Sequence, residues 1–317
     1  EQRLCDWPRQ LGIEPEVLAY DPHPNYSAAA FVRRADIWPG ACRIAVQHHM
    51  AHVAAGCVAE EVWTPCTGLA FDGTGYGTDG MTWGGEFFAG APTVGFTHIG
   101  RLRPFLLPGA ERAITEPWRI ALALAHAAGI SDIAAPPGVA AETFDIVRHL
   151  LTSSVPTVVR TTSAGRLFDG LSAMLNLCTF AEQEAQAARA LEHAATQVGE
   201  ITDEYPVRCT RADDGVWELD WRPMLRQAYA EQRRGEAPGM IAARFHAWLA
   251  RASVALIIEA GETTVVVASG GVLWNALFRR HLSQQCQRHG IRLVTPRRVP
   301  PSDASVAVGQ AVLASHL

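Results

Sequence analysis

The chain has 317 residues, 48% of them hydrophobic, and a formal net charge of −5. This length and apolar content allow one large α/β unit or two lobes, and they exclude a chain without a packed core. The acidic balance and the absence of a long Lys/Arg run exclude the usual electrostatic signature of a nucleic-acid-binding surface.

The seven cysteines are scattered along the chain, and no Cys-x-x-Cys pair occurs. Their odd number and apolar neighbours indicate reduced, buried thiols rather than a disulfide framework. Residues 252–261 are apolar but too few to cross a bilayer, and the start carries no signal peptide. We therefore predict a cytoplasmic protein that binds neither membrane nor nucleic acid. Because the first residue is Glu, we expect the chain to begin within a longer polypeptide.

Short strands and helices alternate at the start of the chain. The pattern predicts the end of a helix over 3–13, a strand over 16–21, a loop running into a helix over 22–36, a strand over 42–47, and a helix ending near residue 61. Residues 67–90 predict a strand, a Gly-rich turn and a second strand.

Helices dominate residues 115–200, and the helix over 116–129 ends in glycine, a typical C-terminal signal. A loop with a short hairpin over 203–222 and a strongly amphipathic helix over 240–261 are expected next. The remaining segments predict strand, Gly-Gly and helix over 263–282, a strand over 291–296, and a helix starting near Ser302 or Asp303. Strands interleaved with helices indicate an α/β fold.

Three histidines stand within five positions of the Ala-rich segment AVQHHMAHVAA, residues 45–55. His48 and His52 are four residues apart, so a helix places both imidazoles on one face, where they can share a metal ion. His49 points about 100° away by helix geometry, which suits a second-sphere or substrate-contacting group. Two interpretations stay open: a metal site, or hydrogen-bonded histidines of the core.

A divalent ion needs three or four ligands, and two carboxylates are candidates to complete the set. Asp72 ends the predicted strand GLAFD, and Asp303 stands at a predicted helix start. Each also has an ordinary structural interpretation. Asp303 can be a helix N-cap, and Asp72 can shape a turn.

Two Gly-rich segments follow predicted strands. DGTGYGTDG leads into another strand, which argues against a Rossmann or Walker site and leaves an anion-binding nest or a plain hairpin. Gly270 and Gly271 lie between a strand and a helix, where a phosphate or flat ring can approach the helix N-terminus. Asp169 lies in an apolar helix, so it needs a partner such as a ribose or Arg166. The spacing of residues alone does not specify a reaction.

Together, in chain order, these motifs resemble the C-terminal transferase part of the HypF carbamoyltransferases of nickel–iron hydrogenase maturation. The matching segments are VQHHMAHVAA, LAFDGTGYGTDGMTWGGEFF, LPGAERAITEPWR, SAGRLFDGLSAML, QEAQAA, ASGGVLWN and VPPSDASVAVGQA. The resemblance covers nearly the whole chain. It implies a two-lobed actin/Hsp70/sugar-kinase (ASKHA) fold, shared with tRNA threonylcarbamoyl transferases, whose first lobe is incomplete at its N-terminus.

The resemblance also implies domains and site residues. Residues 1–63 would be the remainder of the first lobe, 64–300 the second lobe with helical insertions, and 301–317 a loop and final helix closing the metal site. The implied metal ligands are His48, His52, Asp72 and Asp303, and His49 is the expected catalytic group. The implied nucleotide-binding residues are Gly73, Thr74, Gly75, Gly165, Asp169, Gly270, Gly271 and Asn275. Glu184 and Gln186 match a family stretch to which we assign no role.

The activity implied is transfer of a carbamoyl group from carbamoyl-adenylate, made from ATP and carbamoyl phosphate, to the C-terminal cysteine of a HypE-type acceptor. This is a step toward the cyanide ligands of the hydrogenase iron. A divalent metal, zinc or iron, is expected, with Mg²⁺ as an optional further ion. Because the partner supplies the nucleophile, no nucleophilic residue needs to stand out in this chain.

Several positions depart from the family pattern. Met50 replaces a histidine, Ala185 a glycine and Trp274 a glutamine, while 304–305 are Ala-Ser where Gly-Gly is usual. The acylphosphatase-like, zinc-finger and YrdC-like domains of full-length members and the first hairpin of the first lobe are not in this sequence. We therefore expect these residues alone to perform only the transfer half-reaction.

Two alternative functions remain open. One is an O-carbamoyltransferase of natural-product biosynthesis, which would act on a small-molecule hydroxyl without HypE. The other is a non-catalytic nucleotide-binding scaffold. A tRNA-modifying relative fits less well, because the chain is acidic and carries DGTGYG where that family has Ser-Gly-Gly.

Overall fold

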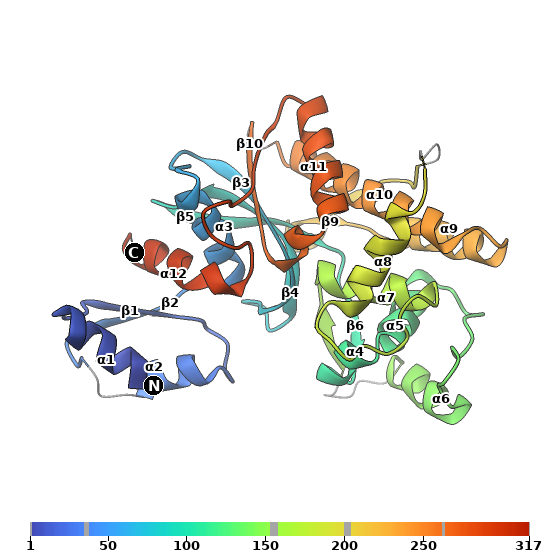
Figure 1. Ribbon diagram of the computed structural model, residues 1–317, viewed down its shortest axis with the longest axis horizontal. Coiled ribbons are helices and arrows are strands. Elements are labelled where there is room, and N and C mark those ends of the chain that lie inside the picture. Colours follow the sequence, from blue (N-terminus) through green and yellow to red (C-terminus); the bar gives the residue numbers. More distant parts are fainter. Residues whose placement is uncertain (1, 35–37, 153–157, 200–203, 262–263, 317) are drawn as a thin grey trace.

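The computed structural model describes residues 2–34, 38–152, 158–199, 204–261 and 264–316 and shows a mixed α/β protein (Figure 1). A small N-terminal unit, blue in Figure 1, lies beside the C-terminal helix. Its two strands are parallel, and Tyr20 pairs with Ala45 at their ends. The unit consists of α1 (Gln2–Leu11), β1 (Val17–Tyr20), α2 (Ser27–Arg34) and β2 (Cys42–Ala45).

The rest of the chain is built on one nine-stranded mixed sheet. Its main path runs β11-β10-β3-β4-β5-β9-β8, and β7 joins β6 to the side of β4. The pairs β11–β10, β10–β3 and β5–β9 are parallel, whereas β3–β4, β4–β5 and β8–β9 are antiparallel. The strands are β3 (Cys66–Tyr76), β4 (Thr82–Ala91), β5 (Gly95–Leu102), β6 (Phe105–Pro108), β7 (Val158–Thr161), β8 (Cys209–Arg211), β9 (Trp217–Leu219), β10 (Val265–Ser269) and β11 (Arg292–Val294).

Helices cover both faces of this sheet. α3 (His48–Ala59) and α12 (Val306–Ala314) pack together on one face. The remaining helices lie on the other side. These are α4 (Glu111–Thr115), α5 (Trp118–Ala128), α6 (Ala141–Leu150), α7 (Ala164–Met174), α8 (Gln186–Thr196), α9 (Arg222–Arg233), α10 (Pro238–Glu259) and α11 (Ala276–Arg288), with the 3₁₀ turns η1 (Gly271–Trp274) and η2 (Asp303–Ser305). A large core joins Phe71 and Phe87 of the sheet to all of these α-helices except α6, which packs on α5 through a smaller cluster.

Helix α3 is buried on nearly every side, which explains its Ala-rich, weakly amphipathic sequence. It approaches its neighbours at glycines. A Cβ on Gly68 of β3 would lie 2.5 Å from a methyl group of Val53, and one on Gly309 of α12 would lie 2.6 Å from the carbonyl carbon of Ala51. Small residues therefore let α3 sit close to both the sheet and α12, and this fixes where its histidines lie.

The predicted elements before residue 61 are all present, with boundaries a few residues shorter. The predicted position of the Gly-rich turn is wrong. Residues 73–75 lie inside β3, and the turn to β4 occupies 77–81, where Gly80 has a φ of +79°. The helix after Gly271 also begins later than predicted, because η1 intervenes and α11 starts at Ala276.

Helix α10 has the length and hydropathy of a membrane span, but 78% of its most apolar window is buried inside the protein, as expected for the central helix of a folded core. The prediction of buried thiols is confirmed for Cys57, Cys66, Cys178 and Cys286, whereas it is wrong for Cys42, which is exposed at the start of β2.

Candidate metal centre

Four side chains from three distant parts of the chain meet at one point. His48 and His52 come from α3, Asp72 from β3 and Asp303 from η2. The Nε2 atom of His52 lies 3.6 Å from Asp72 Oδ2 and 3.3 Å from Asp303 Oδ1, and the corresponding distances from His48 Nε2 are 3.8 and 3.5 Å. This is the group with metal-ligand chemistry found among the described residues.

These distances fit a cation held between the four groups. Ligand atoms about 2.1 Å from one ion lie about 3.4 Å apart when the geometry is tetrahedral. The Nε2 atoms of His48 and His52 are buried, and neither has a hydrogen-bond partner in the described part of the chain. Buried imidazole nitrogens are costly without a partner, and a divalent ion would satisfy both. Two nitrogens and two carboxylate oxygens suit zinc or iron.

The electrostatics of the cluster favour positive charge. Burial opposes protonation of His48, but its hydrogen bond to Asp21 and its closeness to the carboxylates of Asp303 and Asp72 outweigh that effect and raise its pKa to about 12. Burial likewise opposes ionisation of Asp72, and the two imidazoles hold its pKa well below its usual range. The nearby imidazoles of His48 and His52 also lower the pKa of Asp303. The site is therefore built to hold cationic charge, as protons or as a metal ion.

A bulge in β3 aims Asp72 at the histidines. Phe71 pairs with Gly85 and Gly75 with Trp83, so residues 72–74 oppose only Gly84. A Cβ on Gly84 would lie 3.1 Å from the carbonyl carbon of Asp72, so this approach requires glycine. The other carboxylate oxygen of Asp72 accepts the N–H of Gly271 at 2.9 Å. The Gly-rich sequence therefore forms a strand bulge that orients the Asp72 carboxylate toward the histidines.

Ser163 helps to hold the bulge in β3, a role that the sequence did not reveal. Its hydroxyl lies 2.9 Å from the carbonyl oxygen of Asp72 and 2.8 Å from that of Gly73. The same oxygen accepts the N–H of Arg166 and caps α7. Gly165 in the first turn approaches Gly73 so closely that a Cβ would lie 2.9 Å from its Cα. The bulge and the start of α7 are thus locked together.

The cluster lies at the edge of a cavity of about 710 Å³. The cavity brings together most of the predicted nucleotide-site residues from β3, α7, the loop before α8, η1 and η2. Its predicted members are Asp72, Gly73, Thr74, Gly165, Asp169, Glu184, Gly271, Asn275 and Asp303. Ala185, where the family pattern has glycine, has a φ of +54°, the left-handed conformation that glycine adopts without strain.

The structure gives Asp169 the arginine partner that was one of its two expected partners. Asp169 Oδ2 lies 2.6 Å from a terminal nitrogen of Arg166. Burial raises the pKa of Asp169, and the Arg166 guanidinium opposes that shift. Arg166 also donates from Nε to the carbonyl oxygen of Gly73 at 3.2 Å. This pair ties the cavity wall to the bulge in β3.

Asn275 is oriented by contacts within the protein. Its Oδ1 accepts the N–H of Phe278 at 2.8 Å and caps α11. Its amide nitrogen lies 3.0 Å from His246 Nε2, and His246 Nδ1 lies 2.7 Å from the carbonyl oxygen of Ala242. The carbonyl can only accept, so His246 carries its proton on Nδ1 and accepts at Nε2. The neutral imidazole of His246 thereby accepts a hydrogen bond from the Asn275 amide and fixes that side chain at the cavity wall.

This arrangement predicts acid sensitivity. Burial lowers the pKa of His246 to about 4, although its bond to Ala242 opposes the shift. The unfolded chain binds this proton near pH 6.5, so stability falls as pH drops from about 6.5 toward 4, by roughly 1.4 kcal/mol per pH unit. Urea unfolding at pH 7 and 5 should show the wild type losing roughly 2 kcal/mol more than His246→Gln. Parallel losses in the two proteins would contradict this assignment.

Six predicted residues lie outside the lining of the cavity: His48, His49, His52, Gly75, Gly270 and Gln186. His49 is fully buried, and a Cβ on Gly75 would lie 3.0 Å from its Nε2, so its ring lies against β3. Burial and the charge on His48 hold the pKa of His49 well below its usual range. Gly270 packs on Phe71, and Gln186 accepts the N–H groups of Glu182 and Gln183.

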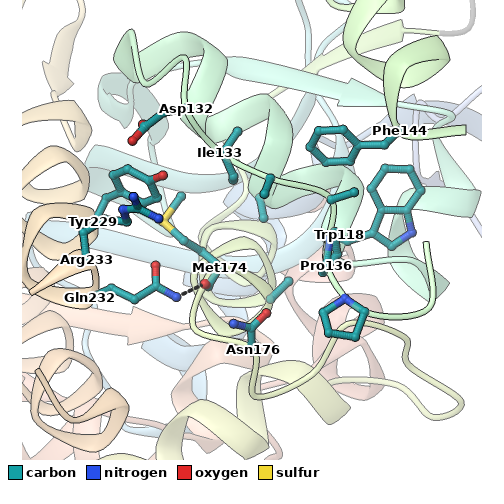
Figure 2. Close-up of a pocket in the computed structure, with 15 residues that line it drawn as sticks. Trp118, Asp132, Ile133, Pro136, Phe144, Met174, Asn176, Tyr229, Gln232 and Arg233 are labelled. Atoms are coloured by element: carbon teal, nitrogen blue, oxygen red, sulfur yellow. Dashed lines mark hydrogen bonds between the residues drawn. The ribbon is translucent and has the colours of Figure 1, made fainter. Parts of the chain in front are cut away.

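A second cavity, of about 420 Å³, lies in the helical part of the protein (Figure 2). The aromatic rings of Trp118 and Phe144 form one side of it, and the polar groups of Tyr229, Gln232 and Arg233 gather on the other. None of the predicted ligands or nucleotide-site residues lines it. The 710 Å³ cavity is therefore the one associated with the metal-ligand cluster.

Family models match almost the whole chain. One described as "Carbamoyltransferase, Kae1-like Domain, second subdomain" matches residues 68–310, and one described as "HypF Kae1-like domain" matches residues 1–60.

Curated relatives and a solved structure point to the same family as the family models. The HypF carbamoyltransferase of Rhodobacter capsulatus is 35% identical, covering 99% of this chain and 41% of that protein. A carbamoyltransferase HypF homolog of Cupriavidus necator is 33% identical, covering 95% of this chain and 78% of that protein. A crystal structure of full-length HypF in a phosphate- and nucleotide-bound form matches with a TM-score of 0.87 at 28% identity, covering 99% of this chain and 48% of that one. The chain thus spans less than half of the Rhodobacter protein and of the crystallised HypF.

Proposed function

Since this chain belongs to the HypF carbamoyltransferase family, whose C-terminal part it matches, we propose that it transfers a carbamoyl group from carbamoyl-adenylate to the C-terminal cysteine of a HypE-type protein. ATP and carbamoyl phosphate would be the source of the adenylate, and the cytoplasm the place of the reaction. The product would serve cyanide-ligand synthesis in nickel–iron hydrogenase maturation. A two-lobed ASKHA architecture, divided at residues 63/64 and 300/301, is part of the same proposal.

The observation that carries this proposal is the position of the ligand cluster at the edge of the 710 Å³ cavity. We assign His48, His52, Asp72 and Asp303 as ligands of zinc or iron. When bound, the ion would supply positive charge to the phosphate and carbonyl oxygens of the substrate. The adenylate would lie across the cavity with its phosphate at Gly73–Gly75 and its adenosine toward Asp169, Gly271 and Asn275; Mg²⁺ beside the phosphates is an optional further ion.

The chain's own residues hold this geometry. The N–H of Gly271 binds the carboxylate of Asp72, and the hydroxyl of Ser163 binds its backbone carbonyl. Arg166 links the neighbouring carbonyl, that of Gly73, to Asp169. In the proposed transfer, the acceptor thiolate attacks the carbamoyl carbon and the bond from that carbon to the phosphate oxygen breaks. The products are a thiocarbamate and AMP. The role of His49 stays a prediction. Its buried ring lies against that of His48, which fits a group that helps to position His48.

The transfer is tested by mixing the chain with carbamoyl-adenylate and a HypE-type acceptor and measuring the intact mass of the acceptor. We expect one carbamoyl adduct, lost when the acceptor's terminal cysteine is replaced by serine. His52→Ala should abolish the adduct. Carbamoylation of a small-molecule hydroxyl without the acceptor would favour the O-carbamoyltransferase alternative. ATP binding without any transfer would favour a non-catalytic scaffold.

The nucleotide part of the proposal predicts a separable effect at Asp169. Asp169→Ala removes a charged hydrogen-bonding group from the cavity wall, so ATP binding should weaken by about 10-fold or more. Zinc affinity should stay within about 2-fold of the wild type, because Asp169 is not among the four ligands. Calorimetry with ATP measures the first and chelator competition the second, with Asp145→Ala, an exposed carboxylate on α6, as the control. Unchanged ATP affinity would refute the nucleotide role of Asp169.

A further inference from the structure

A third carboxylate contacts the cluster from the N-terminal unit. Asp21 directly follows β1, and His48 begins α3 shortly after β2. The two strands are parallel, and their last residues, Tyr20 and Ala45, are paired. The carboxyl ends of parallel strands meet at the same edge of a sheet, so the residues that follow them become neighbours. Asp21 is brought to His48 in this way, although 27 positions separate them.

Both oxygens of Asp21 are engaged. Oδ2 lies 2.8 Å from Nδ1 of His48, and Oδ1 accepts the backbone N–H of His23 at 2.8 Å. His48 is 2% exposed. The carboxylate can only accept, so Nδ1 of His48 donates to it. This bond fixes the rotation of the ring and leaves Nε2 facing Asp72 and Asp303.

The other histidine of the cluster has no such support. Nδ1 of His52 is buried and has no hydrogen-bond partner among the described residues. The ring of His52 is placed by packing in the buried core around α3 and by the approach of its Nε2 atom to Asp72 and Asp303. The two imidazoles are therefore unequal: one is fixed by a carboxylate from the N-terminal unit, and the other is not.

We propose that Asp21 is the positioning residue of the metal centre. It accepts a hydrogen bond from the Nδ1–H of His48 and so orients the ring. Through this bond the N-terminal unit contributes to cation binding. The proposal rests on the proposed function in treating His48 as a ligand. Carboxylate partners of ligating histidines fix the ring and increase its basicity, and their loss typically weakens metal binding about 10- to 100-fold.

The test measures zinc affinity by chelator competition in purified Asp21→Ala, Asp21→Asn and His23→Ala proteins. Asp21→Ala should weaken zinc binding about 10- to 100-fold. Asp21→Asn keeps an oxygen that can accept the Nδ1 proton, so it should lie closer to the wild type and stays informative if Asp21→Ala does not fold. His23→Ala is the matched control, because it alters the same loop while keeping the backbone N–H that binds Asp21.

A spectroscopic measurement separates orientation from general damage. In the zinc-loaded wild type, nitrogen-15 NMR should show a slowly exchanging Nδ1–H proton on His48, which Asp21→Ala removes. Wild-type zinc affinity in Asp21→Ala, or an equal loss in His23→Ala, would overturn the inference. If His52→Ala loses zinc while Asp21→Ala does not, the inference fails and the proposed metal site stands. If His52→Ala also keeps wild-type affinity, both fail.

Discussion

Replacing His52 with alanine is expected to weaken zinc binding by roughly 100-fold or more, because it removes one of the four proposed ligands. The Nε2 atom of His52 makes the shortest approach to a carboxylate in the cluster, 3.3 Å to Asp303. The variant also leaves Asp72 buried with a single imidazole beside it, which adds an uncompensated charge. Metal analysis of the purified protein and chelator competition measure the effect.

His126→Ala is the control for that experiment, since it removes an exposed imidazole on α5 that is not one of the four proposed ligands. It should retain its zinc. Metal that binds only the folded state stabilises it, by an amount that grows with the logarithm of the free metal concentration. A chelator should therefore lower the melting temperature of the wild type and leave that of His52→Ala unchanged. Equal zinc content in wild type and His52→Ala would show that the four residues do not form a metal centre.

Gly309→Ala is expected to have the largest effect on stability. A Cβ at this position of α12 would overlap the backbone carbonyl group of Ala51 in α3, and no side-chain rotation relieves a clash with backbone. The two helices must move apart, which should lower the free energy of unfolding by about 3 kcal/mol. His52 follows Ala51 directly and Asp303 precedes α12, so the same movement should spread the ligands and weaken zinc binding.

Urea denaturation measures the loss of stability, and Val308→Ala serves as the control. Val308 lies on the same helix but is exposed, so its truncation should change the free energy of unfolding by less than about 0.5 kcal/mol. If Gly309→Ala were as stable as the control, α12 would not pack on α3 through this glycine.

Histidine spacing was sufficient to predict half of the candidate site. Residues four apart on a helix share a face whatever surrounds the helix, so the His48/His52 pair could be recognised from the sequence. Pairing them with Asp72 and Asp303 needed the family resemblance, because each carboxylate also had an ordinary local role. The structure brings all four together, and η2 begins at Asp303 without a side-chain capping bond.

Other features could not be predicted from local sequence. The segment DGTGYG was expected to be a turn, yet the same glycines serve a strand bulge. Asp21 and Ser163 carried no signal of their own, because each acts on a residue at least 27 positions away. One general signal could have found Asp21: it directly follows a strand that pairs in parallel with the strand before the histidines.

The sequence by itself determined the α/β class, the order of most elements, and the helix that presents two imidazoles on one side, because these depend on periodicity and on neighbours within a few residues. Only the tertiary structure decided which carboxylates face those imidazoles, which aspartate is hydrogen-bonded to His48, and where the cavity lies. The physical reason is that such contacts join segments far apart in the chain. Their distances depend on strand register and on the close approach of α3, β3 and α12 at glycines.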